Sequence, residues 1–166
     1  MKLYFLRHST AFERNPETYP DDRLRPLTNW GRKKMVKIAR LFPKLDIQVG
    51  LILSSPFLRA SETAVIARKA LGLKKDRLIL TDRLAPLGEA DQLIAEIQAN
   101  YTGTDLLLVG HEPDLNELIS MLLVNDTSLS LRLNKGGICC LSTNELMARK
   151  CATLEWMLNP SQMLKM

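Results

Sequence analysis

The sequence predicts an α/β fold: three α/β/α layers built on a mostly parallel central sheet with an antiparallel edge. Up to Leu123, short apolar segments of strand length alternate with segments of helical periodicity, an order typical of parallel sheets covered by helices on both faces. From Ser128 onward, short segments alternate between polar and apolar residues, which is typical of antiparallel strands. The length of 166 residues suits one domain, and we expect that domain to span residues 1–166.

Turn and cap residues mark the limits of the predicted elements. Thr28 can cap a helix that ends at Pro43, and Ser55-Pro56 is a typical helix start, with a capping hydroxyl and a proline at the first helical position. Further helices are expected from Ser55 to Gly72, from Glu89 to Gln98 and from Pro113 to Leu123. Strands are expected at Leu3–Leu6, Val49–Leu53, Leu78–Leu80, Leu106–Val109, Ser128–Leu133, Gly137–Leu141 and Cys151–Trp156.

The composition excludes several classes of protein. Hydrophobic residues make up 46% and charged residues 25% of the chain, the balance of a globular protein rather than of a disordered or fibrous one. No apolar segment is long enough to span a bilayer, and the N-terminal one is too short for a signal peptide and ends at Arg7-His8. We therefore expect a cytoplasmic protein without a membrane partner.

Cysteine content and charge narrow the choice of ligands. Two of the three cysteines, Cys139 and Cys140, are adjacent, which suits neither a disulfide framework nor a zinc site, and there are only two histidines. We expect no metal and no cofactor. The net charge of +5 is spread over the chain and only 5% of the residues are aromatic, so a phosphate ligand or an acidic partner fits better than nucleic acid.

Three of the predicted strand-to-helix junctions contain polar residues suited to chemistry. These residues are Arg7 and His8 after the first strand, Ser54, Ser55 and Arg59 after the second, and His111 and Glu112 after the fourth. Because the carboxyl ends of parallel strands meet at one edge of the sheet, the three junctions can converge on one pocket. Both histidines of the chain lie at these junctions, which favours a common site over two unrelated core histidines.

The residue types at these junctions suit phosphoryl transfer. Helix N-termini attract anions, and arginines hold phosphate with two parallel hydrogen bonds while they keep their charge. A neutral imidazole can be the nucleophile and form a covalent phosphohistidine that water later hydrolyses. Arginines and the second histidine can offset the charge on the equatorial phosphate oxygens, so this chemistry requires no metal ion.

The motifs at the junctions match those of a known family. Leu6-Arg7-His8-Ser9 resembles the Arg-His-Gly signature of the histidine phosphatase (phosphoglycerate mutase-like) superfamily, the segment Ser54–Ala64 resembles its second motif, and Val109-Gly110-His111-Glu112 resembles its third. Their order and spacing agree over nearly the whole chain. The resemblance implies a phosphoglycerate mutase-like fold with His8 as the nucleophile and with Arg7, Arg59 and His111 as the phosphate pocket.

Within this superfamily the chain is most similar to the SixA phosphohistidine phosphatases. The similar features are its small size, Arg25-Pro26-Leu27-Thr28, Gly110-His111-Glu112-Pro113 and the ending Leu164-Lys165-Met166. The resemblance implies a metal-independent phosphatase that removes phosphate from phosphohistidine in a partner protein.

The sequence departs from the family pattern at two places. Ser9 stands where the family has glycine, and its side chain could tighten the pocket. Larger members of the family place a glutamate acid after the third strand, where this chain has Leu84-Ala85-Pro86. The nearest carboxylates are those of Glu89 and Glu112. In the phytase-like branch of the superfamily an acidic residue after the second histidine is the acid, so the resemblance implies this role for Glu112. The dipole of the following helix explains a carboxylate there equally well. A protonated imidazole departs readily, so phosphohistidine needs an enzyme acid less than an alkyl phosphate does.

Two further residues are candidates for substrate binding, and two other functions stay open. Thr10 can reach the phosphate, although a turn or cap role suits it better, and Arg25 can equally line the mouth of the pocket or be a surface charge. A phosphatase or mutase of a small phosphorylated metabolite usually has inserted segments that cover its pocket, and this chain has little room for them. A catalytically silent phosphoprotein-binding module needs no nucleophile, so the presence of His8 beside a complete phosphate pocket argues against it.

Overall fold

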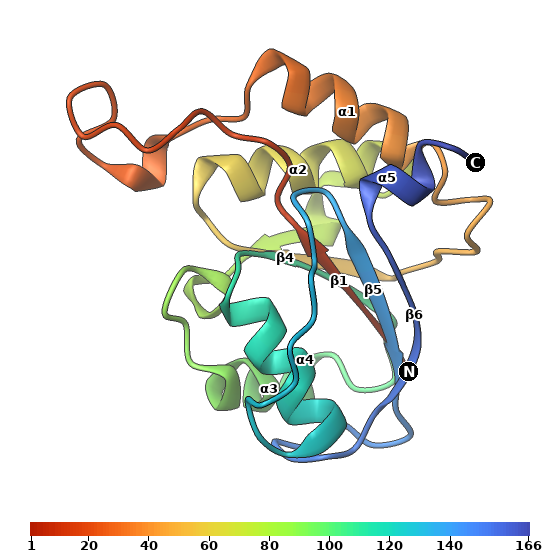
Figure 1. The fold of residues 1–166 in the computed structure, drawn as a ribbon. Helices are drawn as coiled ribbons and strands as arrows, with labels where there is room; N and C mark the ends of the chain where they lie inside the picture. Colours follow the sequence, from red (N-terminus) through yellow and green to blue (C-terminus); the bar gives the residue numbers. More distant parts are fainter.

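The computed structural model describes residues 1–166 and contains a six-stranded sheet between two layers of helices (Figure 1). The strands are β1 (Lys2–Arg7), β2 (Leu51–Ser54), β3 (Leu78–Leu80), β4 (Leu106–Gly110), β5 (Ile138–Ser142) and β6 (Thr153–Leu158). The helices are α1 (Asn29–Ala39), α2 (Leu58–Ala70), α3 (Ala90–Asn100), α4 (Asp114–Val124) and α5 (Pro160–Met163). Three short 3-10 helices, η1 (Asp22–Leu24), η2 (Lys75–Arg77) and η3 (Asp82–Leu84), lie in the loops.

The pairing of the strands brings distant parts of the sequence to one edge of the sheet. The strand order is β3-β2-β4-β1-β5-β6, in which the first four strands are parallel and β5 and β6 are antiparallel additions next to β1. The predicted fold class is thereby confirmed. In this register Arg7 lies opposite Gly110, and Ser54 lies opposite Val109, so the carboxyl ends of β1, β4 and β2 are neighbours.

The core has one apolar layer on each face of the sheet. Phe5 of β1 packs on the face that α3 and α4 cover, whereas Tyr4 and Leu6 pack on the face that α1 and α2 cover (Figure 1). This alternation follows from the two-residue period of side chains along a strand. β4 is buried along its whole length, as expected for a strand covered by helices on both faces. None of the helices has both the length and the apolar character needed to cross a bilayer.

The predicted strand at Ser128–Leu133 is wrong, because the structure has no strand there. Side chains of α4 satisfy the backbone groups of this segment in place of a neighbouring strand. The hydroxyl of Ser120 accepts from the N–H of Leu129 at 3.0 Å, and the side-chain oxygen of Asn116 accepts from the N–H of Leu131 at 3.2 Å. The alternating pattern therefore reflects a segment laid across a helix.

The start of α2 also differs from the prediction, since the helix begins at Leu58 rather than at Ser55-Pro56. The hydroxyl of Ser55 accepts from the N–H of Phe57 at 3.2 Å in the turn before the helix, and it lies 2.8 Å from Nε2 of His111. Ser55 thus belongs to the surroundings of the second histidine. The remaining limits shift by a few residues: α1 ends at Ala39 and continues as turns, α3 runs from Ala90 to Asn100, and β6 runs from Thr153 to Leu158.

The first turn of α1 packs directly against the segment that follows His8. The carbonyl of Thr10 accepts from the N–H of Thr28 at 3.0 Å, and the hydroxyl of Ser9 donates to the carbonyl of Gly31 at 2.8 Å. A Cβ atom on Gly31 would lie only 1.9 Å from the carbonyl oxygen of Thr10. A residue without a side chain is therefore required where α1 approaches this segment.

Replacement of Gly31 by alanine should destabilise the protein, although alanine normally favours a helix over glycine by about 1 kcal/mol. The added methyl group meets backbone rather than a movable side chain, and overpacking of this kind costs about 1–3 kcal/mol. Urea unfolding measures the effect, and Lys33→Ala, an exposed position in the same helix, is the control. An unfolding free energy equal to or above that of the wild type in Gly31→Ala would contradict this packing.

Candidate active site

The first two site residues, Arg7 and His8, lie at the carboxyl end of β1 between two neighbouring segments. The N–H of His8 donates to the carbonyl of Gly110 at 3.0 Å, which extends the pairing of β1 with β4 by one residue. The backbone of Arg7 donates to Gly137 and accepts from Gly136, both at 3.1 Å, in the turn before β5. These bonds hold both residues at the edge of the sheet, and the His8 side chain is buried there.

The hydrogen bond of its ring determines which nitrogen of His8 is available for chemistry. Nδ1 lies 2.7 Å from the carbonyl oxygen of Ser9. A carbonyl only accepts hydrogen bonds, so Nδ1 carries the ring proton and donates it. The lone pair of the neutral ring is therefore on Nε2. This is the arrangement that a nucleophilic imidazole requires.

Burial keeps the His8 imidazole neutral. Burial lowers the pKa of His8 from its usual 6.5 to about 2, and the neighbouring His111 and the charges of Arg59 and Arg7 act in the same direction. A cationic imidazole has no lone pair with which to attack phosphorus. The same cations that would bind a phosphate group thus also preserve the nucleophile at neutral pH.

The second histidine, His111, faces the first across a short gap. Their ring centroids are 5.1 Å apart and the rings are inclined by 55°. Nε2 of His111 lies 2.8 Å from the hydroxyl of Ser55, and Nδ1 is buried without a partner. When the Ser55 hydroxyl donates to Nε2, the ring proton resides on Nδ1, where it can donate to an anion. Burial lowers the pKa of His111 to about 3, followed in effect by the charge of Arg59.

Arg59, in the first turn of α2, is nearly completely buried and is held by the loop that contains η1. Its Nη1 donates to the carbonyl of Asp22 at 2.9 Å, and its Nη2 lies 3.0 Å from the Asp22 carboxylate. The same carboxylate accepts from Nε of Arg25 at 2.8 Å. The guanidinium of Arg59 also lies 5.0 Å above the ring of Phe57. One acidic residue therefore holds two arginines at the site.

The unpartnered polar atoms of the protein interior are concentrated at this site. Only four buried side-chain nitrogen or oxygen atoms lack a hydrogen-bond partner, and they are Nε of Arg7, Nε of Arg59, Nδ1 of His111 and Oε1 of Glu112. Buried polar groups are normally paired, and an unpaired one carries a free-energy cost of about 1–3 kcal/mol. Three of these four are nitrogens that can donate to an anion. The structure thus brings together donors suited to a phosphate group beside the lone pair of His8.

Glu112, which directly follows His111, has a buried side-chain oxygen without a hydrogen-bond partner. Burial raises its pKa from 4.5 to about 7, and the charge of Arg7 opposes that shift. The other carboxyl candidate, Glu89, is exposed at the start of α3, where Oε2 accepts from the side chain of Gln92. Of the two, Glu112 therefore has the burial and the protonation state suited to proton transfer near neutral pH.

The two further candidates for substrate binding already have partners. The hydroxyl of Thr10 accepts from Nζ of Lys34 at 2.8 Å, and this nitrogen also donates to the carbonyl of Lys135 at 2.8 Å. Arg25 donates to the carbonyl of Phe12 as well as to Asp22, but its charge still lowers the pKa of His111. Arg25 thus lies close to His111 and Arg59, and the bond of Thr10 to Lys34 holds the segment after His8.

Sequence reasoning missed three residues that shape the site. Asp22 binds Arg59 and Arg25 from a loop without regular pattern, so only the cluster of charges from Asp21 to Arg25 could have drawn attention to it. Phe57 stacks edge-on against His111 at 5.3 Å and lies in the recognised second motif. Lys34 is buried, and burial lowers its pKa to about 8, but its helical position reads like that of a surface lysine.

Comparison with known proteins agrees with this arrangement. The family model of the histidine phosphatase superfamily (branch 1) matches residues 3–88, which include both Arg7-His8 and Arg59. The chain belongs to the histidine phosphatase superfamily. A curated protein of Picosynechococcus, described as uncharacterized, is 36% identical over 83% of this chain and 82% of its own length. The phosphohistidine phosphatase SixA of Escherichia coli is 27% identical over 76% of this chain and 77% of its own length.

Solved structures of superfamily members have the same fold. The protein histidine phosphatase SixA complexed with tungstate matches with a TM-score of 0.82 and 24% identity over 97% of this chain and 98% of that chain. A mycobacterial glucosyl-3-phosphoglycerate phosphatase in complex with inorganic phosphate matches with a TM-score of 0.71 and 20% identity over 96% and 98% of the two chains. The fold is thus shared by phosphatases with protein and with small-molecule substrates in their names.

The serine that replaces the glycine of the superfamily signature is accommodated without entering the pocket. The N–H of Ser9 donates to the hydroxyl of Thr63 at 3.0 Å, and its own hydroxyl donates to Gly31 of α1. Both bonds connect Ser9 to helices on one face of the sheet. The serine therefore reinforces the segment after His8, and both of its bonds are directed to α1 and α2 rather than to the histidines.

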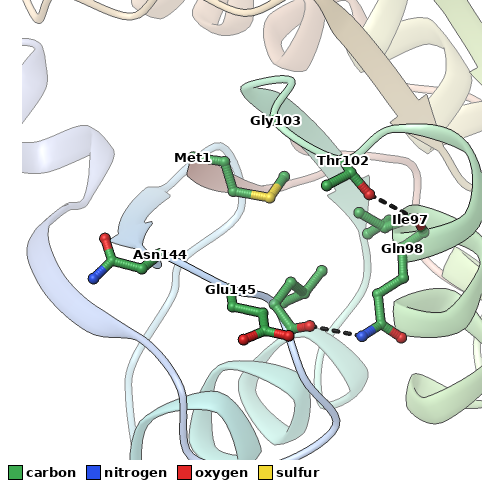
Figure 2. A pocket seen from close by; sticks show the side chains of 8 residues that line it. Met1, Ile97, Gln98, Thr102, Gly103, Asn144 and Glu145 are labelled. Carbon is green, nitrogen blue, oxygen red and sulfur yellow. Dashed lines mark hydrogen bonds between the residues drawn. The ribbon is translucent and has the colours of Figure 1, made fainter.

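A separate cavity of about 260 Å³ lies at the opposite edge of the sheet (Figure 2). Met1, directly before β1, lines it together with Ile97 and Gln98 at the end of α3. Gln98 is already bonded, since its side-chain nitrogen donates to the carbonyl of Leu146 at 2.7 Å. None of the candidate site residues lines this cavity. No group of three His, Cys, Asp or Glu side chains is arranged to hold a metal ion either.

The raised pKa of Glu112 predicts a change in stability with pH that Glu112→Gln should remove. Native Glu112 binds its proton more tightly than the unfolded residue does, so its contribution is fully present below pH 4.5 and is lost as pH rises through 7. We expect the unfolding free energy of Glu112→Gln, relative to wild type, to increase from pH 4.5 to above 7.

Urea unfolding between pH 4.5 and 8 measures this difference. The lowered pKa values of His8 and His111 act in the opposite direction below pH 6.5, but both proteins share them, so the comparison isolates Glu112. Glu117→Gln, at a neighbouring exposed position whose charge contributes least to the raised pKa of Glu112, should give a much weaker trend. Parallel stability curves for wild type and Glu112→Gln would show that Glu112 is not desolvated.

Proposed function

We propose that this chain is a metal-independent phosphatase that removes phosphate from phosphohistidine in a partner protein, through a covalent phosphohistidine on His8. The observation that carries the proposal is the cluster of unpartnered nitrogens of Arg7, Arg59 and His111 around the free Nε2 of His8. Buried nitrogens without partners, which act together on the His8 imidazole, are suited to the oxygens of a bound phosphoryl group.

The reaction divides into two displacements at phosphorus. Nε2 of His8 forms a bond to phosphorus while the bond from phosphorus to the imidazole nitrogen of the substrate breaks. Water then attacks the phosphorus on His8 while the bond from phosphorus to Nε2 breaks. Both protons of the water stay on the phosphate, which leaves as dihydrogen phosphate, and neutral His8 with its proton on Nδ1 is restored. Arg7, Arg59 and His111 stabilise the charge on the equatorial oxygens in both steps.

The choice of phosphohistidine follows from the carboxyl groups near the site. When the second ring nitrogen of the substrate carries a proton, the leaving group departs as neutral imidazole and needs no proton from the enzyme. The loop after β3, where a glutamate acid would be expected, has the buried apolar residues Leu84 and Ala85. Glu112 is the remaining carboxyl group with a pKa suited to an acid, and a substrate with a poor leaving group would depend on it.

The similar proteins support a phosphohistidine substrate, but they also include a phosphatase named for a small metabolite. The chain is 27% identical over 76% of its length to a protein named phosphohistidine phosphatase, and 97% of it matches the fold of a SixA structure. The glucosyl-3-phosphoglycerate phosphatase among the structural matches keeps a phosphatase of small phosphorylated metabolites as the alternative. Substrate comparison separates the two.

His8 should carry phosphate during turnover. Rapid acid-free quenching of the enzyme with a phosphohistidine substrate should yield a phosphoenzyme that is labile in acid and stable in alkali, and His8→Ala should yield none. The expected loss of activity in His8→Ala is complete, because the other imidazole of the site, that of His111, has its Nε2 bonded to the Ser55 hydroxyl and its ring proton on Nδ1. Full activity in His8→Ala would overturn the proposal, as would a phosphoenzyme on any residue other than His8.

Substrate preference should follow the leaving group. We expect kcat/KM for a phosphohistidine peptide to exceed that for phosphoserine peptides and sugar phosphates by at least about 10²-fold, since only the former departs without an enzyme acid. Glu112→Gln should reduce phosphohistidine hydrolysis by less than about tenfold, whereas loss of a true general acid costs about 10²–10⁴-fold. Glu117→Gln is the matched control.

Two results would contradict this preference. Equal kcat/KM for alkyl phosphates and phosphohistidine would favour a metabolite phosphatase. A loss of about 10²-fold or more with phosphohistidine in Glu112→Gln would instead make Glu112 the acid for that substrate as well.

A further inference from the structure

The charges of the chain are divided between the two faces of the sheet. Residues 29–77, which include α1 and α2, contain twelve basic and three acidic residues, a net charge of +9. Residues 82–126, which include α3 and α4, contain one basic and nine acidic residues, a net charge of −8. Because the two helix pairs cover opposite faces (Figure 1), one face of the molecule is strongly basic and the other strongly acidic.

A groove between the last turns of α1 and α2 lies on the basic face. It has a volume of about 360 Å³ and is lined by Val36, Ala39 and Arg40 of α1 and by Ile66, Lys69 and Ala70 of α2. Four of these six side chains are apolar, and the two charged ones are both cationic and exposed. We call these six residues the basic groove.

The positive charge of the basic groove is not neutralised within the protein. α1 and α2 contain a single carboxylate, that of Glu62, and it is bound by Arg32 at 2.5 Å and by the N–H of Leu27 at 2.8 Å. Arg40 and Lys69 take part in none of the ion pairs of the structure. An apolar floor with unpaired cations at its border is suited to a ligand that is apolar on one side and acidic on the other.

We propose that the basic groove binds an acidic amphipathic helix of a partner protein. A helix presents apolar side chains at positions i, i+3 or i+4 and i+7 along one stripe, which can pack into a groove between two helices. Carboxylates that flank this stripe would pair with Arg40 and Lys69 at the two sides. Small residues such as Ala39 and Ala70 in the lining allow the backbone of such a helix to approach closely.

Other occupants fit the basic groove less well. A membrane surface is bound by protruding bulky side chains, whereas the exposed apolar residues on α1 and α2 near the groove are the short Val36 and Val65. Nucleic acid favours aromatic platforms, and Trp30, the aromatic residue of α1, already packs against Nζ of Lys34 at 4.6 Å. The acidic face of a second copy matches in charge, but such a head-to-tail contact leaves one basic and one acidic face free on every pair and so leads to rings or open chains of molecules.

The basic groove is independent of the candidate active site. Both helices begin near the site, since Thr28 caps α1 and Arg59 lies in the first turn of α2, but the groove is in their last turns. None of the candidate catalytic residues Arg7, His8, Arg59, His111 and Glu112 lines the basic groove. The proposal therefore does not rest on the proposed function, and its test is a binding measurement.

Three synthetic peptides of about 14 residues, four helical turns each, test the proposal. The first has leucines at i, i+4, i+7 and i+11 with glutamates elsewhere on the flanks, the second has the same composition in scrambled order, and the third has lysines in place of glutamates. Fluorescence anisotropy of labelled peptides measures binding to the full chain. We expect the first peptide to bind at least about tenfold more tightly than the scrambled one and the lysine peptide not to bind.

Paired variants identify the site of binding. Arg40→Glu with Lys69→Glu should weaken binding of the first peptide by about tenfold or more. Lys74→Glu with Lys75→Glu is the matched control, because it changes the net charge equally at exposed positions outside the groove. Circular dichroism confirms that both double variants are folded.

Each of the following outcomes would overturn the proposal. Equal affinity for the scrambled peptide, or an equal loss in the control variant, would mean that binding depends on overall charge alone. If no peptide binds and the protein sediments together with phosphatidylglycerol vesicles, the basic groove binds a membrane surface instead. Concentration-dependent self-association that Arg40→Glu with Lys69→Glu abolishes would assign it to a second copy of the chain.

Discussion

The parallel pairing of β1 with β4 is the constraint on which the site depends. It places the end of one strand, with Arg7 and His8, beside the end of another, with Gly110 and His111, and the bond from the His8 N–H to the Gly110 carbonyl completes the junction. A shift of one residue in this register would turn His8 to the opposite face of the sheet. The buried apolar residues of β1 oppose such a shift, because they fill two different cores on its two faces.

The burial of Arg7 and Arg59 at the site determines which groups the neighbouring loops must supply. Desolvation of a guanidinium is costly unless hydrogen bonds compensate it, and Arg59 obtains that compensation from the carbonyl and carboxylate of Asp22. Arg7 obtains part of it from the carbonyl of Leu133 at 2.9 Å. The loop with η1 and the segment before β5 are therefore shaped by the arginines. The nitrogens that remain without partners are the part of this cost that a bound anion would relieve.

Much of the fold and the centre of the site could be predicted from the sequence, because both depend on local patterns. Strand periodicity and the junction motifs were sufficient to predict that Arg7, His8, Arg59 and His111 lie at one edge of the sheet. The strand expected at Ser128–Leu133 was wrong because its backbone is satisfied by side chains from α4, a tertiary contact that no local pattern records. Asp22 was missed for the same reason, since its role is defined only by where its loop folds back.

The sequence also could not reveal that burial shifts the pKa values of Glu112 and His8 in opposite directions. A neutral imidazole and a neutral carboxylic acid are both favoured where water is excluded, so burial lowers the pKa of the one to about 2 and raises that of the other to about 7. At neutral pH the site therefore keeps the His8 imidazole neutral but the Glu112 carboxyl group only partly protonated. An enzyme of the proposed kind would thus have a fully available nucleophile and only a partly available acid, and this difference is the physical basis for proposing a substrate whose leaving group departs without help.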